Sequence, residues 1–164
     1  MLELTDIKLF IKKNSNVINL TINYTDEGDI YNYKINIEGI NYEIKIIDTY
    51  ENISIEYNNE IYRDDNEIQL KLFELFNYKN IEYLDCYINN KINKINDYYY
   101  YDNYNDDYDN QKDILVCNRI IKNKDNKLIK FKFEYYKNEY YLIINDENII
   151  GFDNIIKKID SILC

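Results

Sequence analysis

Residues 17–46, VINLTINYTDEGDIYNYKINIEGINYEIKI, decide the fold. Three segments within them alternate apolar side chains with Asn, Thr, Lys or Glu, and the breaks at Asp26-Glu27-Gly28-Asp29 and Glu38-Gly39 are typical turn sequences. A period of two is typical of strands that bury one face and expose the other. We therefore predict an antiparallel meander whose buried face is formed by Ile18, Leu20, Ile22, Tyr24, Tyr31, Tyr33, Ile35, Ile37, Ile40, Tyr42, Ile44 and Ile46.

The rest of the chain follows either this period or the helical one. We extend the meander over residues 7–57, and helical spacing begins after Arg63, where Asp64, Asp65 and Asn66 are candidate caps. The other predicted elements are a short strand at 53–57, helices at about 66–78 and 81–96, strands at 114–121, 129–135 and 140–144, and an amphipathic C-terminal helix over about 152–163 with Asp153 as its cap.

Runs of strands and runs of helices are typical of the α+β class. We predict an α+β fold with an antiparallel meander sheet or sheets, two middle helices and one C-terminal amphipathic helix. A length of 164 residues suits one domain, because a segment as short as 114–164 is marginal alone. The predicted domain, 1–164, has an N-terminal meander plus helices (1–96), an acidic Tyr/Asp tract (97–113) and a C-terminal meander plus helix.

The charge of the chain favours basic protein partners. It carries 30 acidic and 20 basic side chains, a net charge of −10. This charge repels phosphate backbones, so we expect no direct binding of nucleic acid and expect electrostatic attraction to basic proteins. Asn, Ile, Lys and Tyr are abundant while Ala and Pro are absent. That bias indicates a genome of very low GC content, and it offers a second explanation for the richness in Tyr and Asn.

Several classes of catalytic site are excluded by composition. The chain has no His, which removes Ser-His-Asp and Cys-His catalysis, and three glycines, which form no phosphate-binding loop. Its three cysteines, Cys86, Cys117 and Cys164, form no C-x-x-C pair and are one thiol short of a Cys-only zinc site. We therefore expect a protein that is not an enzyme, with no cofactor and no dedicated metal site.

The same features bear on location. A sparse, odd set of cysteines is typical of reduced thiols in a cytosol. The first residues lack the positive charge and continuous apolar run of a signal peptide, and no apolar run approaches the length of a membrane span. We expect a cytoplasmic protein, in the host cytoplasm if it is viral, with no membrane partner.

The tract 97–113, DYYYYDNYNDDYDNQKD, holds six Asp, six Tyr and no aliphatic residue. Tyr gives a large contact area at low entropic cost, and carboxylates and aromatic faces both attract Lys and Arg. We predict an exposed binding ribbon, with two alternatives: a solvated linker, or an edge strand at 98–101 followed by a loop at 106–109. The predicted partner-binding residues are Tyr98, Tyr99, Tyr100, Tyr101, Asp102, Tyr104, Asp106, Asp107, Tyr108 and Asp109.

A weaker alternative is an enzyme. Asp29, Glu43 and Lys45 match the D…E-x-K arrangement of restriction-type nucleases, in which two carboxylates hold Mg²⁺ and the lysine stabilises the attacking hydroxide. Glu43 and Lys45 are expected on one strand face, with Asp29 approaching from the neighbouring turn. The competing interpretation is that Glu43 and Lys45 belong to the solvated face of their strand.

Basic residues gather in the C-terminal meander. We predict that they form a solvated strand face, with docking onto the acidic half of the chain or onto a second subunit as the alternative. These residues are Arg119, Lys122, Lys124, Lys127, Lys130, Lys132 and Lys137.

Together these features predict a non-enzymatic acidic protein that sequesters or inhibits a basic, nucleic-acid-handling partner, such as a nuclease or a CRISPR effector. Two settings fit: a viral anti-defence inhibitor of the anti-CRISPR kind, and an immunity protein that neutralises a toxin. The alternatives are the Mg²⁺-dependent nuclease and a structural or assembly subunit, a homo-oligomer in which exposed Tyr and Ile side chains serve self-association.

Overall fold

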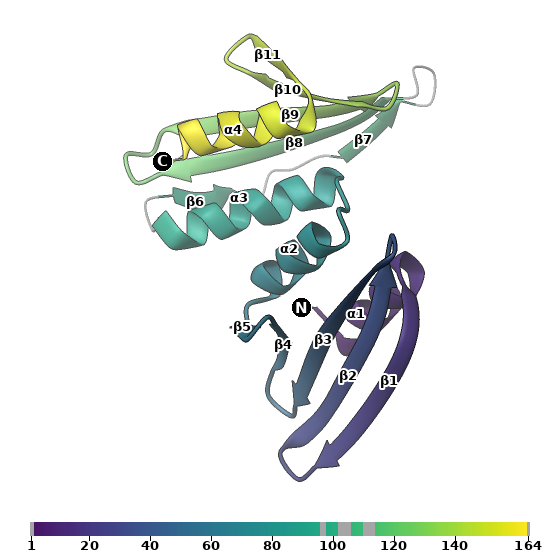
Figure 1. Cartoon of the computed structure of the whole chain (residues 1–164). Coiled ribbons are helices and arrows are strands. Elements are labelled where there is room, and N and C mark those ends of the chain that lie inside the picture. Colours follow the sequence, from purple (N-terminus) through teal and green to yellow (C-terminus); the bar gives the residue numbers. More distant parts are fainter. Residues whose placement is uncertain (1, 96–97, 102–105, 110–113, 164) are drawn as a thin grey trace. The chain divides into compact units, whose positions relative to one another are not determined.

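The computed structural model describes residues 2–95, 98–101, 106–109 and 114–163. The chain forms two compact units, Met1–Tyr78 and Lys79–Cys164, called here the N-terminal and the C-terminal unit. Each unit is an antiparallel sheet with helices packed on it, so the predicted α+β fold is confirmed (Figure 1). The grouping of the whole chain into a single domain stays a prediction.

In chain order, the N-terminal unit is a helix, a meander of strands and a second helix. Its strands follow one another across the sheet in sequence order, and all pairs are antiparallel. Tyr33 lies opposite Ile44 and Ile35 opposite Tyr42, so the apolar residues of the two strands share one face, as the alternation predicts. The elements are α1 (Leu4–Asn14), β1 (Asn16–Thr25), β2 (Gly28–Ile37), β3 (Ile40–Thr49), β4 (Ile53–Tyr57), β5 (Glu60–Tyr62) and α2 (Asp65–Leu75).

Both helices of this unit contribute to one core on the apolar face of the sheet. Of the three candidate caps of α2, Asp64 is the N-cap, because its carboxylate accepts hydrogen bonds from the backbone N–H groups of Asn66 (3.0 Å) and Glu67 (3.4 Å). The buried core residues are Ile7, Ile11, Tyr31, Tyr33, Ile35, Ile44, Ile46, Ile55, Ile68, Leu72 and Phe76.

Helix α1 corrects the prediction that the meander begins at residue 7. Leu4, Ile7 and Ile11 recur at helical spacing, and Ile7 and Ile11 are buried. Lys12 and Lys13 lie in the last turn, where their positive charges interact favourably with the helix dipole and stabilise the helix. The N-terminal segment thus carried a helical signal that the sequence analysis did not use.

Strand β1 also departs from the prediction, because its apolar face is not buried. Leu20 is 38% exposed, Ile22 37% and Tyr24 76%. Leu20 lies opposite the buried Tyr33 and Ile22 opposite the buried Tyr31, so these side chains do point to the core face. Within residues 2–78, however, the buried cluster takes strand residues from β2, β3 and β4 and none from β1. Val17 at the start of β1 packs against this cluster, half-buried, while the rest of the strand lies outside it.

The C-terminal unit contains the remaining elements. Its sheet has the order β11-β10-β9-β8-β6, and β7 also pairs with β8. The elements are α3 (Ile81–Ile95), β6 (Tyr98–Tyr101), β7 (Asp106–Asp109), β8 (Ile114–Asn123), β9 (Leu128–Tyr136), β10 (Glu139–Ile144), β11 (Glu147–Ile150) and α4 (Phe152–Ile162). The cap predicted for α4 is wrong: Gly151 is the N-cap and Asp153 lies in the first turn.

The core of this unit joins α3 and α4 to the sheet. The sequence analysis grouped the helix at 81–96 with the preceding meander, whereas its apolar residues pack with the strands that follow it. The buried residues are Ile81, Leu84, Ile88, Ile92, Cys117, Ile121, Phe131, Phe133, Leu142, Ile144, Ile155, Ile159 and Leu163.

The two units share one order of elements: a helix, an antiparallel meander and a second helix. In each, the first long strand after the first helix has 10 residues, β1 in one unit and β8 in the other. The two strands differ in their surroundings. Among the described residues, β1 has a neighbour on one side only, whereas β8 pairs with β9 on one side and with β6 and β7 on the other.

Candidate functional site

The Tyr/Asp tract contributes two short strands to the edge of the C-terminal sheet. Residues Tyr98–Tyr101 pair with Ile120–Asn123, and Asp106–Asp109 pair with Ile114–Cys117, so the two segments follow each other along β8 (Figure 1). The edge-strand alternative is therefore right for 98–101. The loop expected at 106–109 is a strand instead.

The predicted partner-binding residues divide between these strands and the segment that joins them. Asp102 and Tyr104 lie outside the described residues. Tyr98 to Tyr101 and Asp106 to Asp109 lie in β6 and β7, where the structure gives the backbone pairing. Their role in binding a partner stays a prediction, now attached to a sheet edge.

The nuclease residues are not brought together. Glu43 and Lys45 share the outer face of the N-terminal sheet, as expected of alternate residues in β3. Asp29 lies opposite Asp48, which belongs to the other face of β3 together with Ile46. Asp29 thus occupies the helix-covered face of the sheet, about 10 Å along the strands from the level of Lys45. The two carboxylates and the lysine do not form one site.

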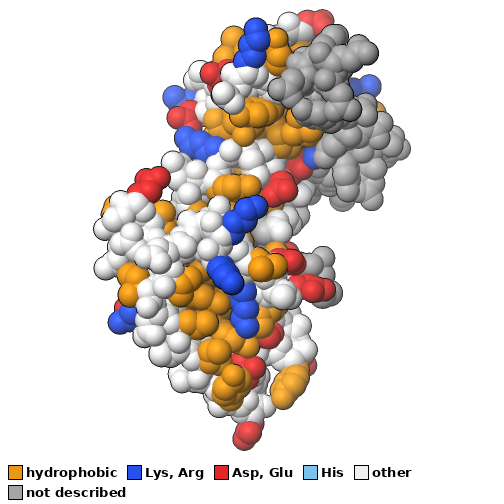
Figure 2. Space-filling model, turned by 90° about the vertical axis from the view of Figure 1, so that its right-hand side faces the viewer, with side chains coloured by type: hydrophobic (Ala, Val, Ile, Leu, Met, Phe, Trp, Pro, Cys, Tyr) orange, Lys and Arg blue, Asp and Glu red, His pale blue; other side chains and the backbone are white. Residues whose placement is uncertain are grey.

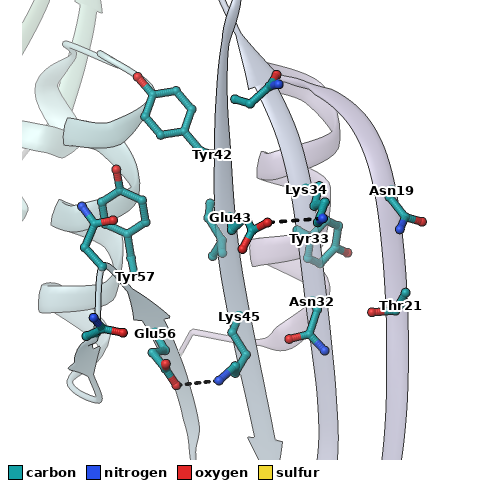
Figure 3. A pocket seen from close by; sticks show the side chains of 14 residues that line it. Asn19, Thr21, Asn32, Tyr33, Lys34, Tyr42, Glu43, Lys45, Glu56 and Tyr57 are labelled. Carbon is teal, nitrogen blue, oxygen red and sulfur yellow. Dashed lines mark hydrogen bonds and ion pairs between the residues drawn. The ribbon is translucent and has the colours of Figure 1, made fainter.

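The outer face of the N-terminal sheet is a shallow polar hollow (Figure 3). Two ion pairs cross it: Lys34 Nζ lies 3.4 Å from Glu43 Oε1, and Lys45 Nζ lies 2.9 Å from Glu56 Oε2. Both Glu43 and Lys45 therefore have a neighbouring partner of opposite charge, which agrees with their interpretation as a solvated strand face. The hollow is also lined by Asn19, Thr21, Asn32, Asn41, Asn58 and Asn59, and by Tyr33, Tyr42 and Tyr57, which are part of the core or pack against it.

A groove beside the first turns of α1 and α2 is lined by more acidic side chains than basic ones. Arg63 is its one basic residue, and the ring of Tyr50 beside it is 92% exposed. The groove offers the same combination of phenol and carboxylate as the tract. No local sequence pattern marks this groove, because its residues come from three separate segments. The acidic residues that line it are Glu3, Asp48, Glu51, Asp64 and Asp65.

Two of these carboxylates also accept hydrogen bonds from backbone N–H groups. Asp64 caps α2, and Asp65 Oδ2 accepts a hydrogen bond from the N–H of Leu2 at 3.0 Å. Asp48 lies near the end of β3 and Glu51 on the segment between β3 and β4, so neither residue caps a helix. They are therefore the groove carboxylates that can be changed with the least effect on the helices.

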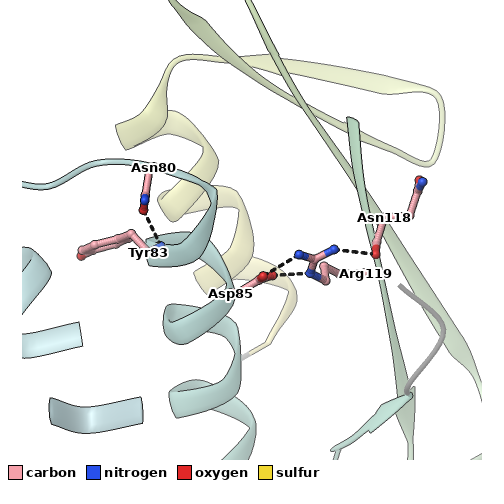
Figure 4. Close-up of polar contacts among 5 residues, drawn as sticks. All are labelled: Asn80, Tyr83, Asp85, Asn118 and Arg119. Atoms are coloured by element: carbon pink, nitrogen blue, oxygen red, sulfur yellow. Dashed lines mark hydrogen bonds and ion pairs between the residues drawn. The ribbon is translucent and has the colours of Figure 1, made fainter. Parts of the chain in front are cut away.

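An ion pair between a buried arginine and an aspartate whose side chain is 23% exposed lies inside the C-terminal unit (Figure 4). Asp85 of α3 accepts two hydrogen bonds from Arg119 of β8, from Nε at 2.5 Å and from Nη2 at 2.6 Å, and Nη1 donates to the carbonyl of Asn118 at 3.0 Å. Arg119 is 3% exposed and lies opposite the buried Phe131. The prediction that Arg119 belongs to a solvated basic face is therefore wrong, because its position in β8 is on the core face.

The neighbouring thiol, Cys86, is buried, and burial together with the negative charges of Asp85 and Glu82 raises its pKa to about 12. The folded protein keeps this proton at pH values where the unfolded chain loses it. Below about pH 9 both the folded and the unfolded chain hold this proton, so its ionisation costs no stability there. We expect the free energy of unfolding to fall as pH rises from about 9 towards 12, by at most about 1.4 kcal/mol per pH unit.

Urea unfolding at several pH values measures this effect. Cys86→Ala carries a cavity cost at every pH, so the informative quantity is the slope between about pH 8 and pH 10.5. The variant is expected to show a shallower decline than the unmodified chain. Equal slopes would mean that the Cys86 thiol ionises alike in the folded and unfolded states.

Comparisons with known proteins assign no family. No protein-family model matches the chain, and no curated protein sequence or solved structure is significantly similar to it. In the part of the chain that the structure describes, no group of three or more Cys, Asp or Glu side chains is placed to hold a metal ion, and no helix is long and apolar enough to cross a membrane.

Proposed function

We propose that this protein is a non-enzymatic, cytoplasmic binding protein that sequesters or inhibits a basic, nucleic-acid-handling partner. The observation that carries the proposal is the distribution of charge. Residues 1–78 hold 15 acidic and 7 basic side chains, and residues 97–113 hold six acidic and one basic. A partner that binds a phosphate backbone presents Lys and Arg side chains, which such surfaces attract. A nuclease or a CRISPR effector is a partner of this kind.

The described surfaces support this proposal with suitable chemistry. The tract strands run along an outer edge of their sheet, and the groove of the N-terminal unit combines carboxylates with the exposed Tyr50. Carboxylates can take the place of phosphates toward Lys and Arg, and a Tyr ring adds contact area and a cation–π partner. Inhibition of a defence nuclease and neutralisation of a toxin remain the two proposed settings.

The pairing of the tract with β8 decides how the proposal is tested. A deletion of residues 98–112 would strip β6 and β7 from β8 and expose a sheet edge, so loss of binding would have two explanations. We therefore choose the substitution Asp106→Asn, Asp107→Asn and Asp109→Asn, which removes three charges and keeps the backbone. We expect it to weaken partner binding about tenfold or more, chiefly by slowing association.

The partner is captured from a lysate of a low-GC bacterial host, purified, and its binding measured at about 50 mM and about 500 mM salt. The matched control, Asp125→Asn, Asp146→Asn and Glu74→Gln, removes three charges from exposed positions elsewhere. A second arm, Asp48→Asn with Glu51→Gln, tests the groove. If binding proved indifferent to salt and equal in all variants, the proposed electrostatic recognition would be rejected.

A further inference from the structure

Strand β1 is a long sheet edge without the usual protection against pairing. Its 10 residues, NVINLTINYT, contain no charged residue and no Pro. The opposite edge of the same sheet, β5, is three residues long and begins with Glu60. Proteins protect exposed edges by shortening them or by placing charges on them, as at β5. A bulge between Val17 and Asn19 interrupts only the start of β1, and pairing is regular from Asn19 to Thr25.

The apolar side chains of β1 form an exposed stripe on one face of this edge. Leu20, Ile22 and Tyr24 point to the core face but lie beyond the helices, and Ile18 at the bulge is 54% exposed. Figure 2 looks from the side on which β1 lies in Figure 1, and it shows apolar side chains gathered over this part of the N-terminal unit. An added strand would supply both the missing backbone partners and neighbours for this stripe.

The C-terminal unit shows how the same architecture covers such an edge. Strand β8, which follows the first helix of its unit as β1 does, carries antiparallel partners along its outer side. In that unit the partners come from the chain itself. The N-terminal unit has no corresponding segment between α1 and β1, where Ser15 alone joins the two elements.

We infer that β1 pairs with β1 of a second copy of this chain, antiparallel and about a two-fold axis, so that the two N-terminal sheets join into one. The sequence of β1 fits itself in this arrangement. With Thr21 at the axis, Thr21 meets its own copy and Leu20 lies opposite Ile22, so apolar residues meet apolar ones on one face and polar residues meet on the other. An isologous contact of this kind closes at a dimer.

The charges that flank β1 favour a second copy of this chain as its partner, and they favour antiparallel over parallel pairing. Lys12 and Lys13, both exposed, precede the strand, and Asp26 and Glu27, both exposed, follow it. With Thr21 at the axis, Asp26 and Glu27 of one copy come level with Asn16 and Ser15 of the other, next to the last turn of α1 that holds Lys12 and Lys13, and this happens twice in the dimer. Parallel pairing would place like charges together. Strand β1 itself has no charged residue, so it offers a basic partner no carboxylate to bind.

The first test is the mass of the protein in solution, by light scattering on a size-exclusion column at about 100 µM, a concentration at which a micromolar interface is filled. The unmodified chain is expected to be a dimer. Ile22→Lys and, as a second variant, Thr21→Lys place two like charges close together at the two-fold axis and are expected to raise the dissociation constant about tenfold or more. Circular dichroism shows whether each variant is folded.

The matched control is Ile61→Lys on β5, the other edge of the sheet. Ile61 is 45% exposed and Ile22 is 37% exposed, so the two substitutions are alike in chemistry and in exposure. The control is expected to stay dimeric. A folded Ile22→Lys and a folded Thr21→Lys that dimerise as the unmodified chain does, or an unmodified chain that is monomeric, would overturn the inference.

Charge exchange tests the direction of pairing. The variant Lys12→Glu/Lys13→Glu has acidic groups at both ends of β1, and Asp26→Lys/Glu27→Lys has basic groups at both ends. Each is expected to dissociate alone, and an equimolar mixture is expected to recover a one-to-one dimer. Absence of this recovery, with both variants folded, would reject antiparallel pairing through β1. This outcome is independent of the proposed basic partner, since no other protein is present.

Discussion

Asp85→Ala is expected to lower the free energy of unfolding by about 3–5 kcal/mol, the largest effect of any single exchange considered for this protein. The substitution removes the acceptor of two Arg119 hydrogen bonds and leaves the guanidinium in the core, where Arg119 is 3% exposed. A buried guanidinium that loses the carboxylate facing it costs more than the pair contributes, because the desolvation penalty of the charge remains. Urea unfolding at neutral pH measures the loss.

Two further variants separate the charge effect from loss of packing. Asp85→Leu with Arg119→Met replaces the ion pair by apolar side chains and is expected to recover most of the stability. Glu43→Ala is the control for an exposed pair, because Lys34 and Glu43 have side chains 61% and 77% exposed, and it is expected to cost less than about 1 kcal/mol. If Asp85→Ala cost no more than Glu43→Ala, the Asp85–Arg119 pair would not be buried as described.

Gly28→Ala is expected to destabilise the N-terminal unit by at least about 2 kcal/mol. Gly28 has a φ of +143°, and a Cβ atom there would lie 2.3 Å from the carbonyl oxygen of Asp48 and 2.8 Å from the Cα atom of Thr49. Both are backbone atoms of the paired strand β3, so the sheet itself must move. Thermal unfolding followed by circular dichroism measures the change.

The glycine of the next turn provides the matched control. Gly39 has a φ of +87°, and a Cβ atom there meets no heavy atom within 4 Å. Gly39→Ala therefore carries the conformational cost of positive φ without the clash, about 1 kcal/mol. Equal losses from Gly28→Ala and Gly39→Ala would show that backbone conformation alone, and not contact with Asp48, limits position 28.

The sequence by itself determined the elements whose signals are local. Alternation predicted the meander and placed Tyr33 and Ile44 on its apolar face, and Asp64 was one of three candidate caps that marked the start of α2. Such features depend on neighbours along the chain, because a period of two or of 3.6 residues places side chains on one face of a single element. The helical spacing of Leu4, Ile7 and Ile11 was equally local and was available to the same argument.

Only the tertiary structure decided which of these faces are covered. Alternation marks Ile22 and Ile44 alike as apolar-face residues, yet Ile44 is 2% exposed and Ile22 37%, because the buried cluster that the helices form with the sheet includes Ile44 and not Ile22. Arg119 was assigned to solvent by its charge, although its strand position faces the core and α3 brings Asp85 to meet it. Burial depends on elements distant in the sequence, and no periodicity within one element encodes how far the neighbouring layer extends.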